Sequence, residues 1–296
     1  MSDKSAENLR GMLLLTVAMA GIAGLDSLGK IASRHADSAW VITGVGLGAF
    51  VGFLVLMRGQ QPLFTRDALN PAALTRTLCE AGASTLMIIS LAFVPLSMIT
   101  VLMQTVPLMI TLGAVLFLGE RAAWQDWAAL AAGFGGMLLI VQPGSEALGP
   151  GILITVAATI GFAMRDLASR ATPKTVTNSQ LGAWGGGALA IVGLIWALIS
   201  GATPPPMTLA TLGFFLAIVA LATFSLYCVT AAMRIGDVAT IAPFRYTRLV
   251  FGIGLGILIF DEDLNLATII GGAIIVVSGL YVWQRERVRA RRAKAA

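Results

Sequence analysis

Residues 11–34 read GMLLLTVAMAGIAGLDSLGKIASR and carry no charged side chain before Asp26. A helix that crosses the hydrocarbon core of a bilayer needs about 20 predominantly apolar residues. This stretch has that length, and its charged side chains gather toward its end. It therefore predicts a membrane-spanning helix, and the rest of the chain can be compared with it.

The composition extends this prediction to the whole chain. Of the 296 residues, 57% are hydrophobic and 12% are charged, and the mean hydropathy is +0.86. A soluble domain carries about 25% charged residues, and a disordered chain combines low hydrophobicity with high charge, so both classes are excluded. We predict an all-α integral membrane protein with ten transmembrane helices. The expected spans are 11–34, 38–57, 71–92, 96–118, 123–141, 149–170, 178–199, 208–233, 239–260 and 266–284.

The basic residues indicate how the chain is oriented. If the N-terminus is cytoplasmic, fourteen of the twenty lysines and arginines fall on the cytoplasmic side, and only Lys30 and Arg34 fall on the other. Loops rich in these residues stay in the cytoplasm, so we expect both termini there and a multi-pass protein of the cell inner membrane. Six of the fourteen lie between Arg285 and Lys294, beside the last span. That position favours contact with anionic membrane lipid over binding to nucleic acid.

An internal repeat links the two halves of the chain. At a shift of 140 residues the first span overlays the sixth and places Asp26 on Asp166. The halves, 1–145 and 146–296, each hold five expected spans, and an odd number turns the second half upside down in the membrane. Inverted repeats are typical of secondary transporters, whose substrate site lies between the repeats near the midplane. Chance similarity among apolar helices is the alternative interpretation.

Short motifs in both halves resemble those of a known family. They are AFVPL at 92–96, LGE at 118–120, APFRY at 242–246, FDE at 260–262 and GLY at 279–281. With these motifs the chain resembles the ten-helix EamA-type members of the drug/metabolite transporter superfamily. The resemblance implies two helix bundles around a central cavity, lined by helices 1, 3, 4, 6, 8 and 9, that opens to each side in turn. Within the superfamily the chain is similar to exporters of amino acids and other metabolites.

Ionisable side chains inside the spans are candidates for the substrate cavity or for a gate. Each costs roughly 2.5–3.5 kcal/mol on insertion scales, so each needs a compensating role. Asp26 and Lys30 are four residues apart and can pair on one helix face, and Asp166 and Arg170 repeat that spacing. These pairs could be gate charges that separate and re-form as access alternates. Alternatively, each pair neutralises itself near a helix end, and Lys30 and Arg170 reach the interface.

A third pair lies in the expected third span. Arg76 and Glu80 are again four residues apart, and Glu80 should lie deeper in the bilayer than Arg76. Because removal from water disfavours the charged form of a carboxylate, Glu80 is a candidate proton carrier. A structural ion pair is an equally good interpretation.

The most polar segment of the late spans is Arg245–Tyr246–Thr247–Arg248. Arg245 and Arg248 are three residues apart and share a helix face, and two guanidinium groups could hold a substrate carboxylate or phosphate. Alternatively, both reach the cytoplasmic interface from a span end. By the repeat, Gln104 occupies about the same place in the fourth span and is a further cavity candidate.

Two prolines inside spans are candidate hinges. Pro107 lies within the fourth span and Pro243 within the ninth. Each removes a backbone hydrogen bond, which is tolerated where protein or water satisfies the freed carbonyl. We therefore expect the two spans to flex at these positions.

The chemistry that the sequence lacks narrows the function. A single histidine, His35, cannot supply a metal cluster, and no GxxxxGK[ST] motif for ATP hydrolysis is present. We expect no enzyme activity, no catalytic residues, no metal and no cofactor. We predict a secondary transporter, expected to work as a monomer, that moves small metabolites by alternating access, with amino-acid export favoured. The alternatives are import of a cofactor-like metabolite of the vitamin or nucleoside type, multidrug export and, from other classes, a membrane-embedded enzyme or a channel.

Overall fold

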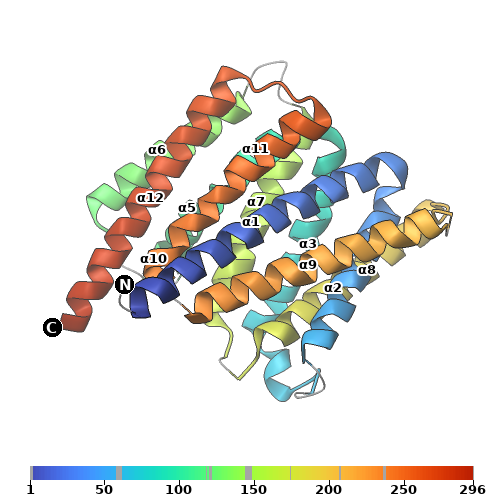
Figure 1. Cartoon of the computed structure of the whole chain (residues 1–296), viewed down its shortest axis with the longest axis horizontal. Coiled ribbons are helices and arrows are strands. Elements are labelled where there is room, and N and C mark those ends of the chain that lie inside the picture. The colour runs from blue at the N-terminus through green and yellow to red at the C-terminus, as the bar shows by residue number, and fades with distance from the viewer. Residues whose placement is uncertain are drawn as a thin grey trace. The chain divides into compact units, whose positions relative to one another are not determined.

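The computed structural model describes residues 3–57, 62–117, 119, 122–143, 149–173, 175–206, 208–235 and 238–295. Within these residues all regular elements are helices, whose course is shown in Figure 1. The elements are α1 (Asp3–His35), α2 (Ser38–Met57), η1 (Arg66–Leu69), α3 (Pro71–Phe93), α4 (Leu96–Met103), α5 (Val106–Phe117), α6 (Trp124–Val141), α7 (Pro150–Ala171), α8 (Asn178–Ser200), α9 (Leu209–Ile235), α10 (Val238–Ile241), η2 (Ala242–Tyr246), α11 (Thr247–Phe260) and α12 (Leu266–Ala295).

In this described part of the chain, ten helical segments are long and apolar enough to cross a membrane. They are Ala6–His35, Ser38–Met57, Pro71–Phe93, Leu96–Phe117, Trp124–Val141, Pro150–Ala171, Asn178–Ser200, Leu209–Val229, Ala242–Phe260 and Leu266–Arg285. Their bounds follow the predicted spans closely. The prediction of an all-α membrane protein with ten spans is confirmed, while the inverted relation of the two halves stays a prediction.

Local sequence signals explain where several helices begin and end. The side chain of Asn70 accepts a hydrogen bond from the backbone N–H of Ala72 (2.9 Å), and Pro71 occupies the first turn of α3. Proline suits this position because the first N–H groups of a helix lack intrahelical partners. At its other end α3 stops before Pro95, whose ring disfavours a helical conformation in the preceding residue. The sequence thus separates α3 from α4 with only a short turn.

The helices group into two compact units. Unit 1 comprises 1–24, 95–149 and 225–296, and unit 2 comprises 25–94 and 150–224. Each unit combines segments from both sequence halves, so a compact unit is not a sequence repeat. The two units are described separately below.

In unit 2, α2 and α8 lie side by side and approach each other through glycine (Figure 1). A Cβ at Gly186 would lie 2.7 Å from the backbone nitrogen of Phe50, and one at Gly46 would lie 2.3 Å from that of Ala190. Small residues at such crossings let backbones make van der Waals contact, which is a main source of helix association in lipid. The pairing of α2 with α8 therefore depends on glycine at these positions.

We expect Gly186→Ala to destabilise the fold by about 1–3 kcal/mol, the usual range for overpacking. The added methyl group would meet backbone, which cannot move aside as a side chain can. Gly187→Ala is the matched control, since its Cβ would make an ordinary contact with Phe50 at 3.4 Å. Thermal unfolding in detergent measures both variants, and equal melting temperatures would contradict the proposed crossing.

In unit 1, α6 and α12 lie side by side in the same way (Figure 1). A Cβ at Gly271 would lie 2.5 Å from the carbonyl oxygen of Gly136. The buried carboxylate of Asp126 accepts from the backbone N–H of Ala123 (2.8 Å) and pairs with Arg285 Nε at 3.2 Å. Arg285, counted in the basic tail, thus joins the end of the tenth span to the start of the fifth.

Candidate functional site

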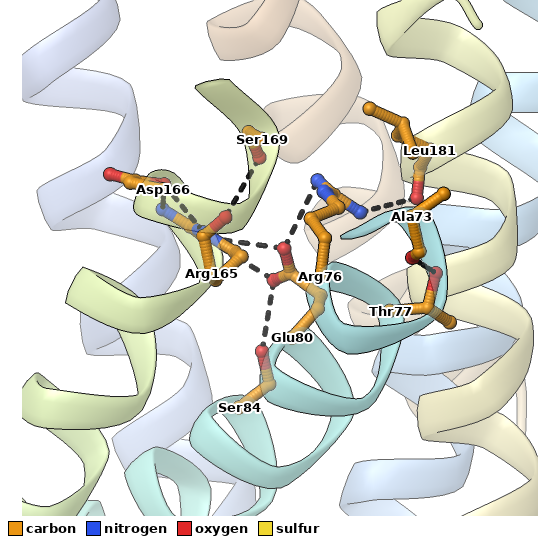
Figure 2. Close-up of polar contacts among 9 residues, drawn as sticks. All are labelled: Ala73, Arg76, Thr77, Glu80, Ser84, Arg165, Asp166, Ser169 and Leu181. Atoms are coloured by element: carbon orange, nitrogen blue, oxygen red, sulfur yellow. Dashed lines mark hydrogen bonds and ion pairs between the residues drawn. The ribbon is translucent and has the colours of Figure 1, made fainter. Parts of the chain in front are cut away.

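A cluster of four charged side chains lies in unit 2, between α3 and α7 (Figure 2). It consists of Arg76, Glu80, Arg165 and Asp166, which we call the charge quartet. In Figure 2 Glu80 lies between the two arginines, and Asp166 lies on the far side of Arg165. Positive and negative groups therefore alternate along the cluster, and the two cations balance the two anions.

Arg76 closes one end of the charge quartet. Its Nη2 lies 3.3 Å from Oε2 of Glu80, one helical turn further along α3. Its Nη1 donates a hydrogen bond to the backbone carbonyl of Leu181 on α8. A cation that both neutralises a carboxylate and satisfies a backbone carbonyl ties α3 to α8.

Arg165 joins the two carboxylates. Its Nε and Nη2 both lie 2.7 Å from Oδ1 of Asp166, and its Nη1 lies 3.4 and 3.3 Å from Oε1 and Oε2 of Glu80. The guanidinium carbon also lies 4.8 Å from the ring centre of Phe162, a cation–π distance. The fixed fork of arginine lets one side chain bind two anions at once, which an ammonium group cannot do as well.

Small and hydroxyl residues make room for the charge quartet and orient it. The hydroxyl of Ser84 donates to Oε1 of Glu80 (3.2 Å). A Cβ at Gly185 would lie 2.7 Å from Cγ of Glu80 and 3.1 Å from Nη1 of Arg76. A Cβ at Gly161 would lie 2.9 Å from that of Ala83, so α3 and α7 also approach closely. The charges are therefore held at a tightly packed three-helix junction.

The charge quartet is partly accessible. The side chains of its members are between 13% and 32% exposed, with Arg76 the most buried and Asp166 the least. The carboxylate of Glu80 is shared, because its Oε2 lies 3.3 Å from a nitrogen of each arginine. A proton on Glu80, or an anionic substrate group at Arg165, would change these pairings. The arrangement is chemically suited to coupling an ion-pair change to helix movement.

Three members of the charge quartet were predicted from the sequence as site candidates, and the fourth was not. Arg76 and Glu80 pair as predicted, and Asp166 joins the cluster through Arg165. The pairing of Asp166 with Arg170 stays a prediction. Arg165 was not singled out, although it lies inside the expected sixth span. The signal for it was that position, since a charge in a span needs a partner. Arg170 is exposed near the end of α7.

Lys30 makes a contact that the sequence did not indicate. It is buried, and its Nζ donates to the backbone carbonyl of Val94 at 2.8 Å. Val94 follows the last residue of α3, where unsatisfied carbonyls and the helix dipole favour a cation. Lys30 therefore caps α3. Asp26, one turn earlier on α1, is half-buried.

In unit 1, the two spans that carry the candidate hinges are both interrupted. The fourth span divides at Gln104, between α4 and α5, with Pro107 in the first turn of α5. The ninth passes through the 3₁₀ turn η2, which contains Pro243, before α11 begins. Discontinuous helices line the substrate sites of many transporters. The hinge role of both prolines stays a prediction.

The remaining sequence candidates of unit 1 lie around these interruptions. Gln104 is buried, Arg248 is half-buried at the start of α11, and Arg245 in η2 is exposed. Tyr246 packs with its hydroxyl group against Gly279 of α12, where a Cβ would lie 1.9 Å from the phenol oxygen. Arg245 is thus more accessible than Arg248, and their joint role in holding a substrate oxyanion stays a prediction.

Glu262 is a residue whose role the sequence did not reveal. It lies after α11, and its carboxylate accepts hydrogen bonds from the backbone N–H groups of Leu96 (2.6 Å) and Ser97 (2.9 Å) and from the Ser97 hydroxyl (2.8 Å). These donors are at the start of α4, where backbone N–H groups lack helical partners and a negative charge is favoured. Glu262 therefore links the end of the ninth span to the start of the fourth.

We expect Glu262→Gln to lower stability by about 1.5–3 kcal/mol, the range for hydrogen bonds to a charged group. The amide keeps the size of the side chain but loses the charge and one acceptor oxygen. Asp263→Asn removes an exposed carboxylate from the same loop and is the matched control. If both variants unfold at the wild-type temperature in detergent, Glu262 does not hold the start of α4.

The sequence profile of the EamA-like transporter family matches the chain twice, over residues 9–142 and 149–283. A solved structure of 20% sequence identity covers 98% of this chain and 99% of its own, with a TM-score of 0.56. At that identity the likeness concerns the fold alone.

Relatives of named function are also similar over much of their length. A riboflavin transporter of Rhizobium johnstonii is 31% identical over 219 residues, which cover 74% of this chain and 72% of the relative. An S-adenosylmethionine uptake transporter of Rickettsia prowazekii is 29% identical over 67% of this chain and 66% of its own length. A pseudopaline exporter of Pseudomonas aeruginosa is 28% identical over 90% of this chain and 94% of its own.

Proposed function

The chain belongs to the EamA-like transporter family, and on this premise we propose that it imports a cofactor-like metabolite across the inner membrane. It is a multi-pass membrane protein and a transporter of small metabolites, which points away from an enzyme. The choice of substrate class rests on two relatives, one named for riboflavin and one for uptake of S-adenosylmethionine.

We further propose that the charge quartet drives the change of access. The observation that carries this proposal is that Glu80 is shared by Arg76 of its own helix and Arg165 of α7. When Glu80 takes up a proton, Arg76 keeps the Leu181 carbonyl and Arg165 keeps Asp166. The ion pair between α3 and α7 is then lost, each cation keeps one partner, and the charge quartet carries one net positive charge. Protonation thereby weakens one helix contact selectively.

The proposed cycle is alternating access by two inverted halves. Its support is the repeat in the sequence, together with the separate match of the family profile to each half. In inverted-repeat transporters one bundle moves against the other around a fixed substrate site. The loss and return of the Glu80–Arg165 contact supplies a step that a proton gradient can bias.

Export of amino acids, which the sequence favoured, is the second candidate function. The relative named as a pseudopaline exporter supports the direction of export, since it aligns with nearly the whole chain. Both candidates share the same fold and the same charge quartet. They differ in substrate and in the direction of net transport, and one assay separates them.

The test uses the full-length protein, purified and reconstituted in proteoliposomes with an imposed pH gradient of either sign. Labelled riboflavin, S-adenosylmethionine and a mixture of amino acids are offered in separate experiments, with protein-free liposomes as the control. We expect saturable transport of riboflavin or S-adenosylmethionine, inhibited by the same compound unlabelled. Transport of amino acids alone would replace our first proposal with the second.

A further inference from the structure

We propose that Thr100, Gln104 and Arg248 form a hydrogen-bonding subsite in unit 1 for a carbonyl or carboxylate oxygen of the transported metabolite. This proposal rests on the proposed transport function and assigns part of the substrate contact. It concerns residues of the fourth and ninth spans, not the charge quartet of unit 2.

The first observation is the buried amide group of Gln104. Its side chain is only 7% exposed, and its Nε2 is buried without a hydrogen-bond partner among the described residues. The hydroxyl oxygen of Thr100, one turn earlier on the same face of α4, is likewise buried and without a partner in that part of the chain. Buried polar groups almost always have partners, and each exception requires an explanation. Two exceptions on one helix face are explained if a polar group of the transported metabolite bonds there.

The second observation is the register in which α4 packs against α11. A Cβ at Gly256 would lie 3.4 Å from Cβ of Ser97, and one at Gly252 would lie 2.4 Å from the Thr100 hydroxyl oxygen. Residue numbers thus fall along α11 as they rise along α4, so the helices run antiparallel here. One further turn along each helix brings Arg248 to the level of Gln104. By this register, residues 104 and 248 lie at about one level of unit 1.

The chemistry of the three side chains selects the ligand group. The amide nitrogen of Gln104 and the guanidinium of Arg248 are donors, and the Thr100 hydroxyl can donate as well. A set of donors fits an acceptor oxygen, and arginine matches a carboxylate in two parallel hydrogen bonds. The interruption at Gln104 supports this assignment, because transporter substrate sites are commonly built at discontinuous helices. The ligand group is therefore a carbonyl oxygen or a carboxylate.

The experiment measures binding of riboflavin, which offers carbonyl oxygens, and of S-adenosylmethionine, which offers a carboxylate, to the full-length protein in detergent. Gln104→Met and Thr100→Val keep side-chain size and remove the polar groups. We expect each to raise the Kd of at least one of the two compounds about tenfold, which corresponds to about 1.4 kcal/mol. Arg248→Gln distinguishes the two oxygens, because it should weaken a carboxylate more than a neutral carbonyl. Unchanged Kd values in both Gln104→Met and Thr100→Val would overturn the proposal.

If the wild type binds neither compound, the proposed substrates are wrong, but the subsite can still be tested by a stability measurement. With no ligand present, Gln104→Met removes a buried donor that has nothing to bind, so its melting temperature should equal or exceed that of the wild type. Thr155→Val is the control, because this buried hydroxyl donates to the Gly151 carbonyl of its own helix (2.9 Å). A fall in melting temperature for Gln104→Met greater than that for Thr155→Val would show a structural amide and overturn the subsite.

Discussion

Glu80→Gln is expected to reduce transport more than tenfold and to destabilise the protein by roughly 1–3 kcal/mol. The amide cannot neutralise Arg76 and Arg165, so two cations share the single charge of Asp166 inside the membrane spans. Breaking a fully buried ion pair costs about 3–5 kcal/mol. The effect here should be smaller because the charge quartet is partly exposed. Initial uptake rates in proteoliposomes and thermal unfolding in detergent measure the two effects.

A charge-balanced double variant separates a functional role of Glu80 from a structural one. Glu80→Gln with Arg76→Gln leaves Arg165 paired with Asp166, so the net charge of the cluster returns to zero. We expect the double variant to recover much of the lost stability but little of the transport. If transport returns together with stability, Glu80 and Arg76 are only a structural ion pair. Loss of the response to a pH gradient in the single variant would further identify Glu80 as the proton carrier.

The ten spans could be predicted from the sequence because hydrophobic length is a local property. A run of about 20 apolar residues predicts a membrane-spanning helix by itself, whatever the helix packs against. The interruptions at Gln104 and in η2 could not be located in the same way. Pro107 and Pro243 indicated where a backbone hydrogen bond is missing. The position at which the helix divides depends also on the neighbours that satisfy the freed backbone groups. Those neighbours are distant in sequence, as Glu262 is from Leu96.

The same distinction applies to the candidate site. Arg76 and Glu80 were found as a pair because one helical turn joins them. Arg165 was missed because its second carboxylate, Glu80, is 85 residues away in the chain. The capping of α3 by Lys30 was missed for the same reason, since the Val94 carbonyl is 64 residues distant. Local spacing thus predicts pairs within a helix, while contacts that join helices require the packed structure.

Arg165→Lys should reduce transport about tenfold although it keeps the positive charge. Arg165 uses three nitrogen atoms to bind Asp166 at 2.7 Å and Glu80 at 3.3 Å. An ammonium group is a single point of charge and lacks the planar fork, so it can serve one carboxylate well but not both. Lysine at this position should therefore keep the contact within α7 and lose the contact with α3. That loss fixes the quartet in the state that we attribute to protonated Glu80.

Two variants complete this test. Arg165→Gln also removes the charge, so its loss of transport should exceed that of Arg165→Lys and be accompanied by a lower melting temperature. Arg170→Lys, at an exposed position near the end of the same helix, should transport at close to the wild-type rate. If Arg165→Lys transports as fast as Arg170→Lys, the guanidinium fork is not required. The charge quartet would then act through net charge alone, and the exchange of partners at Glu80 could not be the step that changes access.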